Sequence, residues 1–153
     1  MKQLIIILII TTMVVAERSK YLNAISTRST AAKGNFLCGK EAAANVKVQL
    51  YSKEGDDDNI LATTTSTLNG DFKIEGNTAG KSDQILEPML KIHHTCNETE
   101  KELKKKKERV VTLRYPKDYV TMGQIPRQTY DIGTLNLQVI YPGEKIEKED
   151  NEK

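Results

Sequence analysis

The chain has 153 residues, and its 23 Lys+Arg against 21 Asp+Glu give a net charge of +2. This length fits one domain. The near-balanced charge and an aromatic content of 5% without tryptophan argue against a dedicated nucleic-acid binder, which needs a basic excess and stacking side chains.

Residues 1–16 have the pattern of a secretory signal peptide. A short basic start precedes an almost wholly apolar run at residues 4–15, and small Val14 and Ala16 precede a predicted cut between Ala16 and Glu17. A run of about twelve residues is too short to span a bilayer, which needs about twenty. The alternative is that this segment stays uncleaved as a membrane anchor. Separately, no later segment is apolar enough to cross a membrane. We expect a soluble, secreted, extracellular protein.

The next residues predict a loose leader at 17–32, followed by one domain at 33–144. From Gly34 onward the patterns are of strand type: Val46, Val48 and Leu50 alternate with polar neighbours, as on a strand with one buried face. Other runs alternate in the same way or are rich in β-branched residues, and Gly, Pro, Asn and Asp separate them. This pattern predicts seven or eight short strands and an all-β sandwich or barrel. The runs lie at 46–51, 60–67, 71–75, 89–94, 109–115 and 133–141.

Turns and the remaining segments are less regular. Asn69-Gly70 predicts a type I′ hairpin turn, and the acidic run at 55–59 predicts a solvated turn. Helical patterns are weak, and the best candidates are 82–86 and 97–108. The charged tail at 145–153 is expected to be disordered.

The two cysteines, Cys38 and Cys96, are expected to pair in an oxidising compartment. Free buried thiols, or pairing with another chain, are the alternatives. Directly after Cys96, Asn97-Glu98-Thr99 is an N-glycosylation sequon in a polar stretch, so we expect an exposed glycan at Asn97.

A block of basic residues follows the sequon on this otherwise neutral chain. As a functional surface it would contact anionic lipid headgroups or sulfated glycans. A solvated loop, or a strand edge protected by lysines, is the simpler interpretation. The block comprises Lys101, Lys104, Lys105, Lys106, Lys107 and Arg109.

Six segments occur in an order that resembles the nematode transthyretin-like family of secreted proteins. The most specific are the His94-Thr-Cys96-Asn97 and Asp131-Ile-Gly-Thr-Leu-Asn-Leu137 motifs. The resemblance covers roughly residues 33–144 and implies a transthyretin-like (prealbumin-like) sandwich of seven or eight strands. It also implies an extracellular protein of mostly unassigned activity. One studied type of member looks like a bridging factor that recognises exposed phosphatidylserine on dying cells and a phagocyte receptor. The six segments are at 34–39, 44–51, 69–72, 88–97, 130–137 and 142–144.

The sequence departs from the family pattern at three places. Family members often carry one further cysteine after the His-x-Cys-Asn motif and another near the C-terminus. Both are missing here, and an aromatic usual before Tyr130 is replaced by Thr129. In the family the missing cysteines would be the partners of Cys96 and Cys38, so their joint loss leaves these two to pair with each other or to remain free.

No residue pattern predicts catalysis, a cofactor or a metal site. On a strand, His94 and Cys96 share a face while His93 points away, and two ligands are too few for a closed zinc site. A related group of enzymes that resembles transthyretin hydrolyses 5-hydroxyisourate, but the N-terminal His and C-terminal Tyr-Arg-Gly-Ser motifs of that group are missing here. The acidic run lacks the ligand spacing of a calcium loop.

We therefore expect a non-enzymatic extracellular binding module whose partner is a protein, or an anionic lipid or glycan surface. The alternatives are a carrier of small apolar ligands, as transthyretin is for hormones, and, ranked last, an exported hydrolase. The sequence does not define the oligomeric state.

Overall fold

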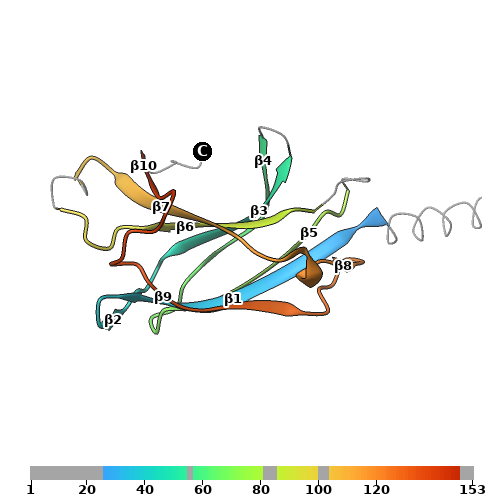
Figure 1. Ribbon diagram of the computed structural model, residues 1–153, viewed down its shortest axis with the longest axis horizontal. Coiled ribbons are helices and arrows are strands. Elements are labelled where there is room, and N and C mark those ends of the chain that lie inside the picture. The colour runs from blue at the N-terminus through green and yellow to red at the C-terminus, as the bar shows by residue number, and fades with distance from the viewer. Residues whose placement is uncertain (1–25, 55–56, 81–85, 100–103, 149–153) are drawn as a thin grey trace, which may run out of the picture.

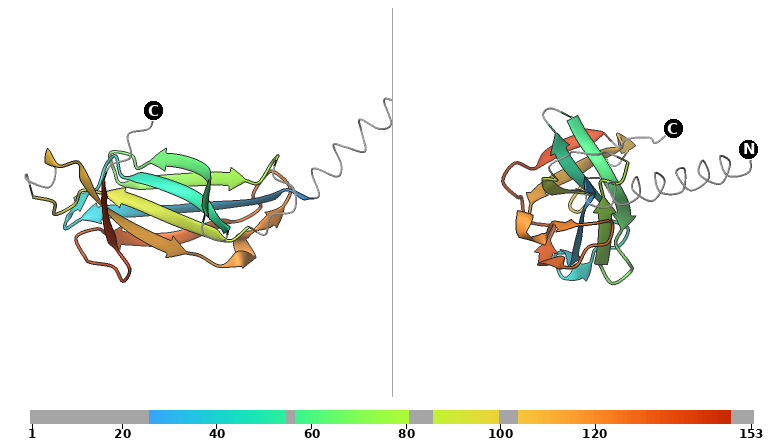
Figure 2. Two further views of the ribbon diagram at one scale, coloured as in Figure 1. Left: turned by 90° about the horizontal axis from the view of Figure 1, so that it is seen from above. Right: turned by 90° about the vertical axis from the view of Figure 1, so that its right-hand side faces the viewer.

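The computed structural model describes residues 26–54, 57–80, 86–99 and 104–148. They form two sheets that pack face to face (Figures 1 and 2), which confirms the all-β sandwich. A single turn of 3-10 helix lies at Lys117–Tyr119. The described strands are β1 (Arg28–Cys38), β2 (Glu41–Ala42), β3 (Lys47–Glu54), β4 (Asp57–Thr65), β5 (Asp71–Asn77), β6 (Pro88–His94), β7 (Lys107–Arg114), β8 (Thr121–Met122), β9 (Thr129–Asn136) and β10 (Lys145–Lys148).

The two sheets differ in how they are built. In the first, the long strand β1 lies at the centre, with β5 antiparallel on one side and β9 parallel on the other. The short strands β2 and β8 pair with the two ends of β1. In the second sheet all neighbours are antiparallel, in the order β10-β7-β6-β3-β4.

The core lies between the sheets and is aliphatic with a few aromatic rings. Phe36 and Phe72 stack at 4.8 Å between ring centroids and tie β1 to β5. At the other end of the core, Tyr130 stacks on Tyr115 at 5.1 Å and meets Tyr119 edge-on at 4.9 Å. Such ring pairs stabilise a core beyond the area that they bury. The aliphatic part includes Val48, Leu50, Leu90, Ile92, Val111 and Leu137.

The leader expected at 17–32 is wrong in its last part, because β1 begins at Arg28. Ser29, Thr30, Ala31 and Ala32 are completely buried. Because four consecutive residues are buried, both faces of this part of β1 are covered, and small residues replace the usual polar–apolar alternation. The Thr30 hydroxyl remains hydrogen-bonded, at 3.0 Å from Tyr115 Oη. Residues 17–25 and the predicted signal peptide at 1–16 lie outside the described residues.

The tail expected to be disordered from 145 is also wrong in its first part. Lys145–Lys148 pair with β7 as strand β10. Its charged residues are compatible with a strand because β10 is a short edge strand, where charge opposes pairing with other chains. Residues 149–153 lie outside the described residues.

The last predicted strand, at 133–141, lies earlier in the structure as β9. Its pairing with β1 stops where β1 ends, with Leu37 opposite Asn136. The Asn136 side chain then bonds the backbone of Gly39 twice, at 3.0 Å each. Val139 and Ile140 are β-branched, but they lie beyond that last β1–β9 pair and form an exposed loop.

The acidic turn and the helical candidates are also revised where they are described. Strand β4 begins at Asp57, and Asp58 forms an ion pair with Lys91. The candidate helix at 97–108 is wrong at its end, because β7 begins at Lys107. Residues 81–85 and 100–103 lie outside the described residues.

Candidate functional site

A disulfide joins the two sheets at one end of the sandwich. Cys38 ends β1 and Cys96 follows β6 by two residues, and their Cα atoms are 5.8 Å apart. In an exported protein such a cross-link is stable. The bond closes a separation of 58 residues, which corresponds to about 4 kcal/mol in the chain-entropy description.

Beside the disulfide, the Arg109 guanidinium links the segment after β6 to the loop between β9 and β10. It donates to the carbonyl oxygens of Cys96 at 3.1 Å, Leu137 at 3.3 Å and Val139 at 3.3 Å. Its Nε forms an ion pair with Glu144, and the Glu144 carboxylate also accepts from the Tyr141 N–H at 3.0 Å. Burial opposes ionisation of Glu144, but the bonds from Arg109 and Tyr141 outweigh it and lower the pKa of this carboxyl.

His94 lies opposite Arg109 across the β6–β7 pair and faces the interior. It is 4% exposed, and neither of its ring nitrogens has a hydrogen-bond partner in the described part of the chain. Burial, with the Arg109 charge nearby, lowers the pKa of His94 to about 4. His94 is therefore a neutral, packed side chain near pH 7.

His93 points to the opposite, outer face of the same sheet. Its Nδ1 lies 3.2 Å from Glu108 Oε2 and its Nε2 lies 3.0 Å from Gln49 Oε1. The two histidines therefore cannot act together on one ligand. Within the described ranges, no three His, Cys, Asp or Glu side chains gather in an arrangement that would hold a metal ion.

The predicted basic block is divided by the fold. Lys104, Lys105 and Lys106 are exposed where the chain returns toward β7, and Lys107 is half-buried at the start of that strand. No ion pair engages Lys104, Lys105 or Lys107 among the residues that the structure describes. Lys104–Lys107 are called the lysine segment below.

Arg109 does not belong to a surface of this kind, because its side chain is buried and saturated by Glu144 and by backbone carbonyls. On strand β7 it faces inward. Lys101 lies outside the described residues. The sequence pattern does not predict the Arg109–Glu144 pair, because it places Glu144 at the end of the domain, with no indication of a buried partner.

Asn97 is exposed at the start of the segment that leads to the lysines. Its backbone adopts φ 63°, a left-handed conformation that asparagine tolerates better than most residues. Its Nδ2 donates to the Gln138 carbonyl at 3.3 Å. The side chain thus leans toward the β9–β10 loop.

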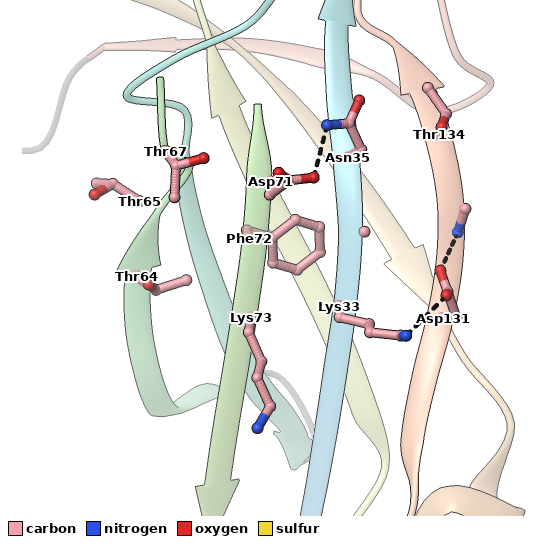
Figure 3. A pocket seen from close by; sticks show the side chains of 12 residues that line it. Lys33, Asn35, Thr64, Thr65, Thr67, Asp71, Phe72, Lys73, Asp131 and Thr134 are labelled. Atoms are coloured by element: carbon pink, nitrogen blue, oxygen red, sulfur yellow. Dashed lines mark hydrogen bonds and ion pairs between the residues drawn. The ribbon is translucent and has the colours of Figure 1, made fainter. Parts of the chain in front are cut away.

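A polar groove of about 670 Å³ is lined by β1, β5 and β9 of the first sheet and by the end of β4, in the second sheet (Figure 3). Lys33 pairs with Asp131 at 3.3 Å, and Asn35 donates to Asp71 at 2.9 Å. Asp131 also accepts from the Gly133 N–H, and the bonds from Gly133 and Lys33 lower its pKa. Lys33 and Asp131 satisfy each other, Asp71 is bonded by Asn35 and Lys73 pairs with Glu75. The groove therefore offers mainly hydroxyl groups, from Thr64, Thr65, Thr67 and Thr134.

The sandwich, its cross-sheet disulfide and the buried Arg109–Glu144 pair together define a small disulfide-linked β domain. A family model described as the Transthyretin-like family matches residues 33–116. The chain belongs to the transthyretin-like family.

Relatives from Caenorhabditis elegans agree with this assignment. The chain is 36% identical to Transthyretin-like protein 46 over 126 residues, which are 81% of this chain and 68% of that one. It is 35% identical to Transthyretin-like protein 33 over 79% of this chain and 82% of that one. It is 33% identical to Transthyretin-like protein 5 over 82% of this chain and 88% of that one.

Among solved structures, a 9R-lipoxygenase from Cyanothece PCC8801 aligns with 72% of this chain and 16% of its own length. The TM-score is 0.42 and the identity 18%, so this likeness carries no argument. In the described segments, no helix is both long and apolar enough to span a bilayer.

Proposed function

We propose that the chain is a secreted, non-enzymatic binding module that contacts an anionic extracellular surface through the lysine segment. The observation that carries the proposal is the exposure of Lys104, Lys105 and Lys106 together at one end of the sandwich. Lys33, Lys73, Lys91 and Lys117 each have a carboxylate partner, whereas no ion pair engages Lys104 or Lys105 within the described residues. The lysine segment is thus a local positive charge on a nearly neutral protein.

The matching surface is a membrane that exposes an anionic lipid such as phosphatidylserine. Each lysine near such a membrane contributes about 1 kcal/mol. Four lysines together would give about 4 kcal/mol, which corresponds to a millimolar affinity. One chain would therefore bind weakly, and a second contact or several chains on one surface would be needed for stable bridging.

Carriage of an apolar ligand has less support. The groove of Figure 3 is lined by threonines and by charged side chains that pair with one another. An apolar ligand would leave these polar groups without water and gain little in return.

The proposal is tested with vesicles containing phosphatidylserine at millimolar accessible lipid. We expect Lys104→Glu/Lys105→Glu to abolish co-sedimentation, because it reverses two charges within a Debye length of the membrane. The matched control is Lys53→Glu/Lys73→Glu, which changes the net charge equally at two other exposed positions and should retain binding. Equal loss in both variants would make the effect one of net charge alone and would contradict the proposal.

A further inference from the structure

A small pocket lies at the end of the sandwich, between the segment after β6 and the β9–β10 loop. Its volume is about 390 Å³, within the range of pockets that hold small ligands. The contributing residues are Asn97, Glu98, Arg109, Gln138, Ile140, Glu144, Lys145 and Ile146.

The pocket combines exposed aliphatic side chains with a charged pair that is already satisfied. Ile140 is 79% exposed and Ile146 is 60% exposed. Arg109 and Glu144 bind each other and nearby backbone groups, so their charges are not available to an ionic ligand. Glu98 and Lys145 also line the pocket and place charged groups beside the two isoleucines. An apolar face with polar groups at its edges suits a sugar ring, whose hydroxyl groups can bond these side chains.

A sugar attached to Asn97 would lie at the pocket. Its side chain lines the pocket and donates from Nδ2 to the Gln138 carbonyl, in the loop that also carries Ile140. Asn97 and Thr99 of the sequon are both exposed. Attachment of a sugar to Nδ2 replaces one of its two hydrogens, so the other can still donate.

We propose that Asn97 carries an N-linked glycan whose first N-acetylglucosamine lies against Ile140 and Ile146. The sugar comes from a lipid-diphosphate-linked oligosaccharide. The bond from Nδ2 to the sugar C1 forms, the bond from C1 to the diphosphate oxygen breaks, and the Nδ2 proton leaves with the diphosphate. The glycan then covers aliphatic surface that would otherwise face water. The inference needs export, but it does not depend on binding to an anionic surface.

The test uses the full chain secreted from a glycosylating host. Intact mass first establishes occupancy of Asn97. One sample is trimmed enzymatically to a single N-acetylglucosamine, and a second is fully deglycosylated, which converts the asparagine to aspartate. We expect the trimmed form to bind little of the neutral dye Nile red, and the fully deglycosylated form to bind it and to melt about 3 °C lower, the scale of one lost packing contact.

Two variants separate the sugar contact from side effects. Thr99→Ala is secreted without the glycan but keeps Asn97 as an asparagine, and it should match the fully deglycosylated form, which shows that the missing sugar and not the new aspartate accounts for the change. In Ile140→Ser/Ile146→Ser, the trimmed and fully deglycosylated forms should be equal in dye binding and melting. A secreted chain without a glycan at Asn97 would overturn the proposal. So would a glycan whose complete removal changes neither dye binding nor Tm.

Discussion

At the scale of single residues, Arg109 connects several separate parts of the chain. It bonds carbonyls of Cys96, Leu137 and Val139 and pairs with Glu144. The ion pair is almost dry, with side chains 11% and 6% exposed. A pair of this kind is costly to break, because the remaining partner is left charged and buried.

We therefore expect Glu144→Gln to lower the free energy of unfolding by about 3 kcal/mol, at the lower end for a broken buried pair. Denaturant unfolding of the secreted chain measures this. The control is Lys73→Gln in the exposed Lys73–Glu75 pair, which should cost less than about 1 kcal/mol. Equal costs for the two variants would show that the Arg109–Glu144 pair is not structurally special.

His94 makes stability depend on pH in a defined window. The unfolded chain takes up a proton at this residue near pH 6.5, whereas the folded chain does so only near pH 4. Protonation thus favours the unfolded state as the pH falls between these values, with a loss of about 2–3 kcal/mol at acid pH. Stability contributed by neutral His94 is fully present above pH 6.5.

The measurement is denaturant unfolding of wild type and His94→Leu between pH 7 and pH 4. The variant cannot take up this proton, so its stability should fall less steeply than that of wild type. His93→Gln keeps His94 and should keep the steeper fall. Parallel curves for wild type and His94→Leu would refute a buried, neutral His94.

At the scale of the elements, the turn before β5 shows how closely the backbone packs. Gly70 has φ 83°, and a Cβ placed on it would lie 2.3 Å from the Phe36 carbonyl oxygen. Asn69 is not among the residues with positive φ, so the turn is not the expected type I′. Gly70 N–H instead donates to Thr67 at 2.9 Å, as in a type I turn followed by a left-handed glycine.

We expect Gly70→Ala to lower stability by at least about 2 kcal/mol, since left-handed backbone costs 1–2 kcal/mol and the clash adds to it. Thermal unfolding measures the loss. Gly80→Ala is the matched control, because Gly80 has φ 82° but open space where a Cβ would lie. If both variants lose the same stability, backbone strain alone accounts for the effect.

Strands with alternating or β-branched residues were predictable from the sequence, whereas the first part of β1 and strand β10 were not. In β5 and β6 buried residues alternate with more exposed ones, so alternation predicts these strands. Strand β1 begins five residues before the predicted domain edge at Lys33, because small residues buried on both faces form its first part and give no alternating pattern. Strand β10 was missed because charged residues at a sheet edge resemble a disordered tail.

The site was predictable only in part, since contacts between distant segments carry most of it. The two cysteines follow from export, and the structure contains their disulfide. Nothing local distinguishes Arg109 from the lysines before it, although strand alternation turns it inward. Its partner Glu144 lies 35 residues away, and only the β7–β10 pairing brings the two together.

At the scale of the whole molecule, the Cys38–Cys96 bond joins two sheets whose core is modest. Reduction of the bond should lower the free energy of unfolding by about 4 kcal/mol or less, as expected for a loop of 58 residues. Denaturant unfolding with and without reductant, supported by the mass of the unreduced chain, measures this. Free thiols in the secreted protein would contradict the pairing.

The charge of the whole molecule is nearly balanced, but it is not evenly distributed. Lysines that face carboxylates are neutralised locally, whereas the lysine segment extends from one end of the sandwich (Figure 1). This separation is the basis for binding to an anionic surface. It also predicts that binding weakens with salt, since the lysines are exposed and screened.

The most direct test of this account is co-sedimentation of the wild-type secreted chain with vesicles at physiological salt. Vesicles of phosphatidylcholine alone are compared with vesicles that also contain phosphatidylserine, each at several millimolar accessible lipid. We predict binding only to the vesicles that contain phosphatidylserine, with release as salt is raised. Equal binding to both vesicle types, or no binding to either, would contradict the proposed function.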